Sequence, residues 1–309
     1  MKGLGEAMGW IYLVTDPCGE PDMITAATFR LTVSMPDQTA PPTTNFSIPL
    51  PRTIGRVNWR GMWELYLKEV RRFWKVIFQT VAAPVITTLM FLLMMVFAFG
   101  RGSTEIVGYP FEDFLVPGLI IMTMVQNAFA NTSSSILVSK VQGNIVDVLM
   151  PPLSALELTV AWTLGGVTRG IAVGAVCAAT MAFFAQLHLY SFWMVLFHTV
   201  AGCLFMSLVG ILAAVWAEKF DHMAAVTNFI VTPLTFLSGT FYTVDRLPPW
   251  AQFLAHYNPF FYNIDGFRYG FLGHETSRPL TGIAVLIGVN LVMFIWTYGV
   301  IKSGYKLKA

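Results

Sequence analysis

Long uncharged runs separated by short polar segments make up most of this chain beyond residue 75. A helix needs roughly 20 apolar residues to cross the hydrocarbon core of a bilayer. One run contains Arg169 but is otherwise apolar or small and long enough to span. We therefore expect an all-α membrane protein with six transmembrane helices. They cover about 76–100, 114–138, 155–185, 193–217, 222–244 and 279–301.

The uncharged segment 247–264 has a different pattern from these six runs. It contains Pro248, Pro249 and Pro259, together with several amide side chains such as Asn258. Prolines and unpaired polar groups are not tolerated where backbone faces lipid. We therefore expect this segment to be re-entrant or interfacial, between the fifth and sixth spans, and not a span itself.

Residues 58–74, directly before the first span, carry apolar and charged side chains at helical spacing. Their aromatic residues suit the headgroup region, and their cations suit an anionic cytoplasmic leaflet. The pattern predicts an amphipathic helix in the membrane plane. The alternative is a soluble helix docked on a partner.

Residues 1–54 show no sustained periodicity and no cleavable signal, so we expect a disordered cytosolic leader. A true start at Met23 or Met35 is the alternative.

The composition agrees with a membrane protein, because 55% of the 309 residues are hydrophobic and 12% are charged, against about 25% in soluble domains. A net charge of +2 gives no reason to expect a nucleic-acid partner. With six spans, both termini lie on the same side of the membrane. Most of the basic residues fall on segments of that side. These are Arg52, Arg56, Arg60, Lys68, Arg71, Arg72, Lys75, Lys140, Lys219, Lys302, Lys306 and Lys308, against Arg101, Arg246, Arg268 and Arg278 on the other side. The bias predicts that both termini are cytosolic.

Familiar catalytic patterns are absent from the sequence. It contains no GxxxxGK[ST] phosphate loop, no GxSxG elbow and no HExxH pair. Its three cysteines form neither a disulfide framework nor a CxxC metal site. We therefore expect a protein that is not itself an enzyme and that holds no metal or cofactor.

Arg169 is a cation near the middle of a predicted span, roughly 16 Å from a start near Leu158. Such a charge costs on the order of 3 kcal/mol and should face protein or water. It is either a polar point on a translocation path or a structural cation paired with a helix-end carbonyl or a carboxylate such as Glu157. On the same span, small residues recur every fourth position and predict a helix packing seam. They are Gly166, Gly170, Gly174, Ala178 and Ala182.

The connection between the second and third spans, residues 139–157, predicts a short helix between two breaks. Gln142, Gly143 and Asn144 form a turn signal, and Pro151 and Pro152 end the apolar run 145–150. Asp147 and Leu149 lie inside that run. A short helix whose apolar face has nothing of its own to bury against suggests a docking segment for a partner; an ordinary connector is the alternative.

Two stretches resemble the permeases of ATP-binding-cassette transporters of type 2. "TPLTFLSGTFYTVDRLPPWAQFLAHYNPFFYNIDGFRYGFLG" resembles the segment of this family around its fifth span, and "VQGNIVDVLMPPLSALEL" resembles its coupling segment. The amphipathic helix 58–74 resembles the elbow helix, for which we single out Trp59, Trp63, Tyr66, Glu69 and Arg72. The residues carrying the first match are Pro233, Gly239, Phe241, Tyr242, Leu247, Pro248, Pro249, Asn258, Pro259, Asp265 and Arg268.

The resemblance, which covers about residues 55–305, implies a permease of the inner (cytoplasmic) membrane with a type-2 transmembrane domain over 55–309. It implies a dimer of this chain, two copies of a separate ATPase that binds ATP and magnesium, and a re-entrant helical hairpin in which Asp265 and Arg268 can pair on one helix face. The cargo would be a glycan, lipid-linked glycan, lipid or drug-like compound, moved outward. A passive channel or scaffold that needs no ATPase is the alternative.

Overall fold

The computed structural model describes residues 55–99, 105–106, 108–241, 248–273 and 279–307, and this part is mostly helical. The leader 1–54 and the family-motif residues Tyr242 and Leu247 lie outside the described residues. The long helices are α2 (Ala83–Phe99), α3 (Phe111–Val141), α5 (Ala155–Met181), α6 (Phe192–Trp216) and α11 (Pro279–Ser303). The shorter elements are α1 (Trp59–Trp74), η1 (Phe78–Ala82), α4 (Ile145–Leu149), α7 (Phe220–Val226), η2 (Thr227–Val231), α8 (Thr232–Phe236), α9 (Pro249–Tyr257) and α10 (Pro259–Leu272).

Within the described residues, two short strands depart from the otherwise helical structure. β1 (Glu105–Ile106) and β2 (Tyr109–Pro110) form an antiparallel pair directly before α3, with Gly108 at φ 79° in the turn between them. The turn needs a positive φ, which glycine adopts without strain.

Five helices in the described residues are long and apolar enough to span a membrane, which agrees with five of the six predicted spans. They cover Phe78–Ala98, Phe111–Val141, Ala155–Met181, Phe192–Trp216 and Leu280–Ser303. The remaining predicted span, 222–244, corresponds to α7, η2 and α8, which follow one another without a break over 220–236. This run is shorter than the other five, and we call it the α7–η2–α8 segment.

Each of the two π-helical turns, η1 and η2, comes just before a proline. Pro84 is the second residue after η1, and Pro233 is the second residue after η2. A proline inside a helix lacks an N–H donor, and its ring clashes with the carbonyl four residues earlier. The wider π turn relieves that crowding, as π-bulges do in other helices.

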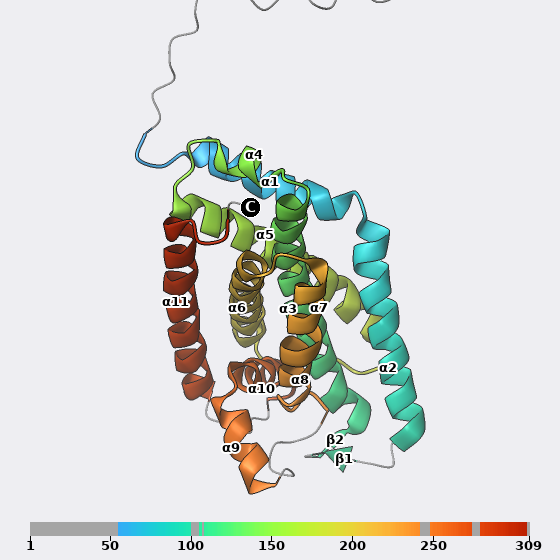
Figure 1. The fold of residues 1–309 in the computed structure, drawn as a ribbon. Coiled ribbons are helices and arrows are strands. Elements are labelled where there is room, and N and C mark those ends of the chain that lie inside the picture. Colours follow the sequence, from blue (N-terminus) through green and yellow to red (C-terminus); the bar gives the residue numbers. More distant parts are fainter. Residues whose placement is uncertain (1–54, 100–104, 107, 242–247, 274–278, 308–309) are drawn as a thin grey trace, which may run out of the picture. The chain divides into compact units, whose positions relative to one another are not determined.

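Helix α3 is the central element of the bundle. Of its apolar window 78% is buried, against 17% for the first span and 22% for α11. It packs against α5, α6, α10 and α2, while α2 and α11 lie at opposite edges (Figure 1). A central position explains why α3 can carry polar residues such as Asn127 and Asn131 at membrane depth.

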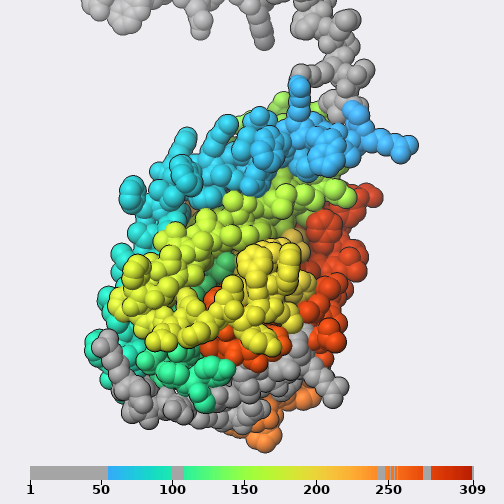
Figure 2. Space-filling model, turned by 180° about the vertical axis from the view of Figure 1, so that it is seen from behind, coloured from blue at the N-terminus to red at the C-terminus, as the bar shows by residue number. Residues whose placement is uncertain are grey.

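The two ends of the bundle differ in their elements. α1, α4 and the chain's last described turn lie at one end, which we call the α1 end, and α9 and α10 lie at the other, the α9 end (Figure 1). A separate hydrophobic cluster forms at the α1 end, where Leu65, Ile145, Trp162, Ile211 and Leu307 are buried together. From the opposite side, α1 runs across the top, with α5 and α6 in lime and yellow below it (Figure 2).

Candidate functional site

Helix α1 is fastened at its start to the start of α5. The Asn58 side chain caps α1 by accepting from Gly61 N at 3.0 Å. The Asn58 N–H donates to Glu157 Oε1, and the other oxygen of Glu157 accepts from Ser154 N at 2.6 Å in a capping box. Glu157 therefore serves helix ends, and our expectation that it could pair with Arg169 is wrong.

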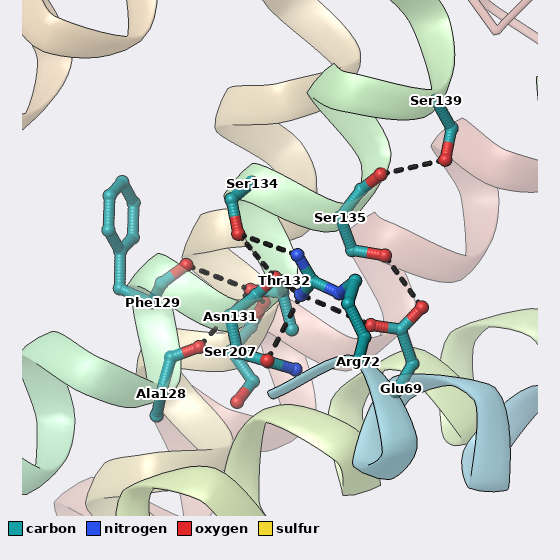
Figure 3. A network of polar contacts seen from close by, with 10 residues as sticks. All are labelled: Glu69, Arg72, Ala128, Phe129, Asn131, Thr132, Ser134, Ser135, Ser139 and Ser207. Atoms are coloured by element: carbon teal, nitrogen blue, oxygen red, sulfur yellow. Dashed lines mark hydrogen bonds and ion pairs between the residues drawn. The ribbon is translucent and has the colours of Figure 1, made fainter. Parts of the chain in front are cut away.

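Farther along α1, a buried acidic side chain anchors the helix to α3 (Figure 3). Glu69 has no exposed surface, accepts from Ser135 Oγ at 2.6 Å, and lies 3.3 Å from Arg72 Nη2. Arg72 in turn donates to Ser134 Oγ at 3.0 Å and to the carbonyl of Asn131 at 2.7 Å. A buried carboxylate needs such partners, so these contacts fix α1 against the bundle.

The approach of α1 to α5 depends on Gly165. A Cβ at this position would lie 2.7 Å from Cβ of Glu69, which is closer than carbon atoms pack. The exposed residues of α1 include the predicted aromatics Trp59 and Trp63, while Tyr66 is half-buried and donates to or accepts from Thr168 Oγ1 at 3.0 Å. The helix thus presents tryptophans outward and a polar anchor inward.

The predicted coupling segment forms a turn followed by the five-residue helix α4. Gly143 adopts φ 74° directly after α3, where its N–H bonds to the Lys140 carbonyl at 3.1 Å. This left-handed position is a helix end that glycine favours. Gln142, Asn144, Asp147, Pro151 and Pro152 are exposed, and Leu149 is half-buried.

One apolar side of α4 is buried within the chain, which corrects our expectation that it has nothing to pack against. Ile145 and Val148 are 2% and 9% exposed, in the cluster with Leu65 of α1. The other side stays open, because Val146 and Met150 are 52% and 75% exposed. We call Val146, Asp147 and Met150 the α4 outer strip.

Lys140 connects the end of α3 to the end of α6. Its Nζ donates to the carbonyls of Ala214, Val215 and Ala217 at 3.1, 2.8 and 2.7 Å, and the side chain is buried. An ammonium group there satisfies carbonyls that a helix end leaves unpaired. The sequence indicates Lys140 only as a cytosolic charge; its place in the last turn of α3 is the signal that could have predicted this contact.

An exposed ion pair lies beside this connection. Lys306 Nζ and Glu218 Oε1 are 2.8 Å apart. The contact with Lys306 lowers the pKa of Glu218, and the contact with Glu218 raises the pKa of Lys306. Because both groups are solvated, this pair contributes little to stability.

At the α9 end, Asn258 joins α9 and α10 to the end of α8. Its Oδ1 accepts from Phe260 N at 3.1 Å and caps α10, while its Nδ2 donates to the Leu234 carbonyl and to Ser238 Oγ, both at 2.9 Å. Pro259 occupies the first turn of α10, where its missing donor costs nothing. Pro248 occupies the position directly before α9 and is exposed.

Arg268 fastens α10 to the turn after α8. Its Nη2 donates to the carbonyls of Gly239 and Thr240 at 2.9 and 3.2 Å, and its guanidinium lies 3.8 Å from the centre of the Phe114 ring. Asp265 and Arg268 are each 5% exposed, on the buried side of α10. Their direct pairing stays a prediction.

The family-motif residues of the turn itself also pack inward. Gly239 adopts φ 76°, a conformation that favours glycine. Phe241 lies 4.9 Å from Phe91 and 5.3 Å from Phe236 between ring centres. Pro233 lies in the first turn of α8.

Three residues of the predicted packing seam, Gly166, Gly170 and Gly174, are buried in helix contacts, whereas Ala178 is half-buried and Ala182, just after α5, is exposed. A Cβ on Gly166 would meet Ser207 Oγ, one on Gly170 would lie 2.7 Å from Cys203 Sγ, and one on Gly174 would meet Met124. The seam therefore touches both α3 and α6. Close packing of helices through small residues is the usual device where lipid gives no hydrophobic driving force.

Arg169 lines a groove between α2, α3 and the α7–η2–α8 segment. The groove has a volume of about 850 Å³, and Arg72 also lines it. Arg169 Nη2 donates to Asn127 Oδ1 at 3.3 Å. A polar neighbour at membrane depth therefore replaces the predicted helix-end carbonyl or carboxylate.

Comparison with known proteins gives consistent matches. Residues 60–272, from the second residue of α1 to the last of α10, match the family described as ABC-2 type transporter. The inner membrane transport permease YadH of Escherichia coli (strain K12) is 35% identical over 251 residues, which cover 81% of this chain and 98% of that protein. Nodulation protein J of Rhizobium leguminosarum bv. viciae is 24% identical over 253 residues, covering 78% and 91% of the two chains.

Proposed function

Because the chain belongs to the ABC-2 type transporter permease family, we propose that it is the transmembrane subunit of an ATP-driven exporter. It is a multi-pass inner-membrane protein of a family that works with an ATP-binding-cassette partner. In the proposed complex, two copies of this chain form the pathway. Two copies of a separate ATPase bind ATP and magnesium and supply the energy. The cargo is an amphipathic, lipid, glycan or drug-like compound.

The α4 outer strip is the observation that carries the coupling proposal. Val146 in this five-residue helix and Met150 directly after it are large exposed apolar side chains, and they fit a pocket on a partner subunit better than they fit water. Its buried side packs under α1, and its preceding turn follows the Lys140 connection to α6. Motion of a docked ATPase would therefore reach α3, α1 and α6 together.

The proposed topology keeps six spans. The α7–η2–α8 segment would be the fifth span. Its 17 residues reach about 25 Å at the rise of an α-helix. The turn after α8 would complete the crossing. α1 would be the elbow helix in the cytoplasmic leaflet. α9 and α10 would be the re-entrant hairpin, and residues 1–54 a cytosolic leader before a transmembrane domain over 55–309.

The coupling proposal is tested by a double variant, Val146→Asp with Met150→Asp. Tagged full-length chain is purified from membranes in mild detergent, and the amount of co-purifying ATPase and its magnesium-dependent ATP hydrolysis are measured. We expect at least tenfold weaker retention of the ATPase, since buried apolar anchors dominate interfaces. Leu189→Asp, at an exposed apolar position near the α9 end, is the control and should retain the partner. Unchanged retention in the double variant would contradict docking at α4.

A passive channel or scaffold is the second candidate. It predicts that the purified chain moves cargo, or holds its partners, with no ATPase present. The orientation is tested separately with a cysteine at Tyr305 in a chain whose native cysteines are replaced. Labelling by an impermeant reagent only after cell lysis supports a cytosolic C-terminus, whereas labelling of intact cells would contradict it.

A further inference from the structure

The groove that Arg169 lines has a distinct chemical character. Its lining includes polar side chains of η1, α2 and α3 such as Gln79, Thr87 and Gln126. Exposed apolar side chains line it too, including Val76 before η1 and Phe220 of α7. The space therefore offers a polar zone and an apolar zone side by side.

The charge in the groove has one sign. Arg72 and Arg169 both line it, and no aspartate or glutamate is among its lining residues in the described part of the chain. Glu69 forms an ion pair with Arg72 within the contact of α1 with α3 (Figure 3). Glu69 offsets the charge of Arg72, so the positive charge of Arg169 remains in the groove.

Arg169 has more donors than partners. A guanidinium carries five N–H groups, and the hydrogen bond to Asn127 Oδ1 is the one that the described part of the structure gives Arg169. Among the residues that the structure describes, the buried Nε of Arg169 has no acceptor, and neither has the buried Nε of Arg72. Both atoms are donors, and both belong to cations whose residues line the groove. An arginine left in this condition at membrane depth points to a ligand.

We propose that this groove binds the anionic head group of an amphipathic substrate, a phosphate or similar oxyanion, with Arg169 as its principal ligand. The inference rests on the proposed transport function and narrows the cargo. Guanidinium N–H groups bind oxyanions strongly and in a fixed planar geometry. Arg72, whose Nη atoms are held by Ser134 and Asn131, would act mainly through its charge. The tail would lie along Val76 and Phe220.

The test compares two probes that differ in the head group. Oleoyl lysophosphatidate and mono-oleoylglycerol share an acyl chain, but the former carries a phosphate. Binding of each radiolabelled probe is measured to the full-length chain in nanodiscs of neutral phosphatidylcholine, without ATPase. We expect wild type to prefer the phosphate probe by at least tenfold. Arg169→Gln should reduce that preference roughly tenfold, as expected for one lost charge-assisted contact.

Controls separate a lost ligand from a misfolded chain. Arg169→Lys keeps the positive charge and should retain part of the preference. Arg60→Gln removes an exposed cation of α1 and should leave the preference unchanged. Each variant is first checked for a wild-type melting temperature. An unchanged preference in a folded Arg169→Gln variant would overturn the assignment.

Two further outcomes would also overturn it. Equal affinity of wild type for both probes would show that the phosphate is not recognised. Displacement of the probe by inorganic phosphate at the same concentration would reassign the site to a free anion. Because these measurements need neither ATPase nor turnover, their failure is distinguishable from a failure of coupling through α4.

Discussion

Replacing Lys140 with methionine should loosen the α1 end of the bundle. Methionine keeps an unbranched chain of similar length, so the packing around the stem is largely preserved. The change removes the ammonium group that donates to Ala214, Val215 and Ala217. The end of α6 then loses its partner on α3, while the fold of each helix is untouched.

The size of the effect follows from burial and the number of bonds. A hydrogen bond to a charged group contributes about 1.5 to 3 kcal/mol, and leaving a buried acceptor unpaired costs about 1 to 3 kcal/mol. The three bonds share one ammonium group, so they do not add. We expect the free energy of unfolding to fall by about 3 kcal/mol, the lower end of the range for removing one partner of a buried charged contact. At about 2 to 4 °C per kcal/mol, the melting temperature falls by about 6 to 12 °C.

The assay is thermal unfolding of the purified chain in detergent, followed by a thiol-reactive dye that reports the buried residues Cys177 and Cys203. Lys219→Met is the matched control, because it removes an exposed cation from the loop after α6. Both variants remove one basic residue from the same predicted cytosolic side. It should unfold within about 2 °C of wild type. A Lys140→Met variant that also unfolds within that range would refute the role given to the three carbonyl contacts.

Three other variants test separate contacts. Gly170→Ala should lower the melting temperature by several degrees, as measured by the same dye, because a Cβ there would lie 2.9 Å from a backbone carbonyl of α3. Gly299→Ala is its control: no described residue has an atom within 4 Å of a Cβ at that position, so the melting temperature should stay unchanged or rise. Asn258→Ala should cost about 1 to 2 kcal/mol through loss of the α10 cap and speed hydrogen exchange in the first turn of α10; unchanged exchange would contradict the cap. Glu69→Gln should keep the bond from Ser135 but leave Arg72 without its ion pair, and increased proteolysis before α2 in membrane vesicles would detect release of α1.

The helices and most of their limits could be predicted from the sequence. Apolar length decides whether a segment can span, and this quantity is local. The prediction for 193–217 agrees with α6 (Phe192–Trp216) to within one residue at each end. The short helix before Pro151 could be predicted for the same reason, because a turn signal and a proline pair mark its limits. Agreement is poorest for 222–244, where π-helical geometry before Pro233 divides the run into shorter elements.

Polar contacts between helices could not be predicted in the same way. Glu69 and Ser135 are 66 residues apart, and Lys140 and Ala217 are 77 residues apart. No local pattern states which faces of two helices meet. Glu157 shows this limit, since it was one possible carboxylate partner for Arg169. Its position three residues after Ser154 signalled instead the capping box that the structure contains.

The glycine seam of α5 sets a limit on which membrane segment could stand in its place. Cellular insertion reads overall apolarity, so an all-leucine helix substituted for residues 155–181 would enter the bilayer readily. It would not pack against its neighbours, because leucine side chains would hold the backbones apart where α3 and α6 now contact α5. Experiments that graft a foreign transmembrane helix into this protein should therefore replace α2 or α11, at the edges, and leave α5 unchanged.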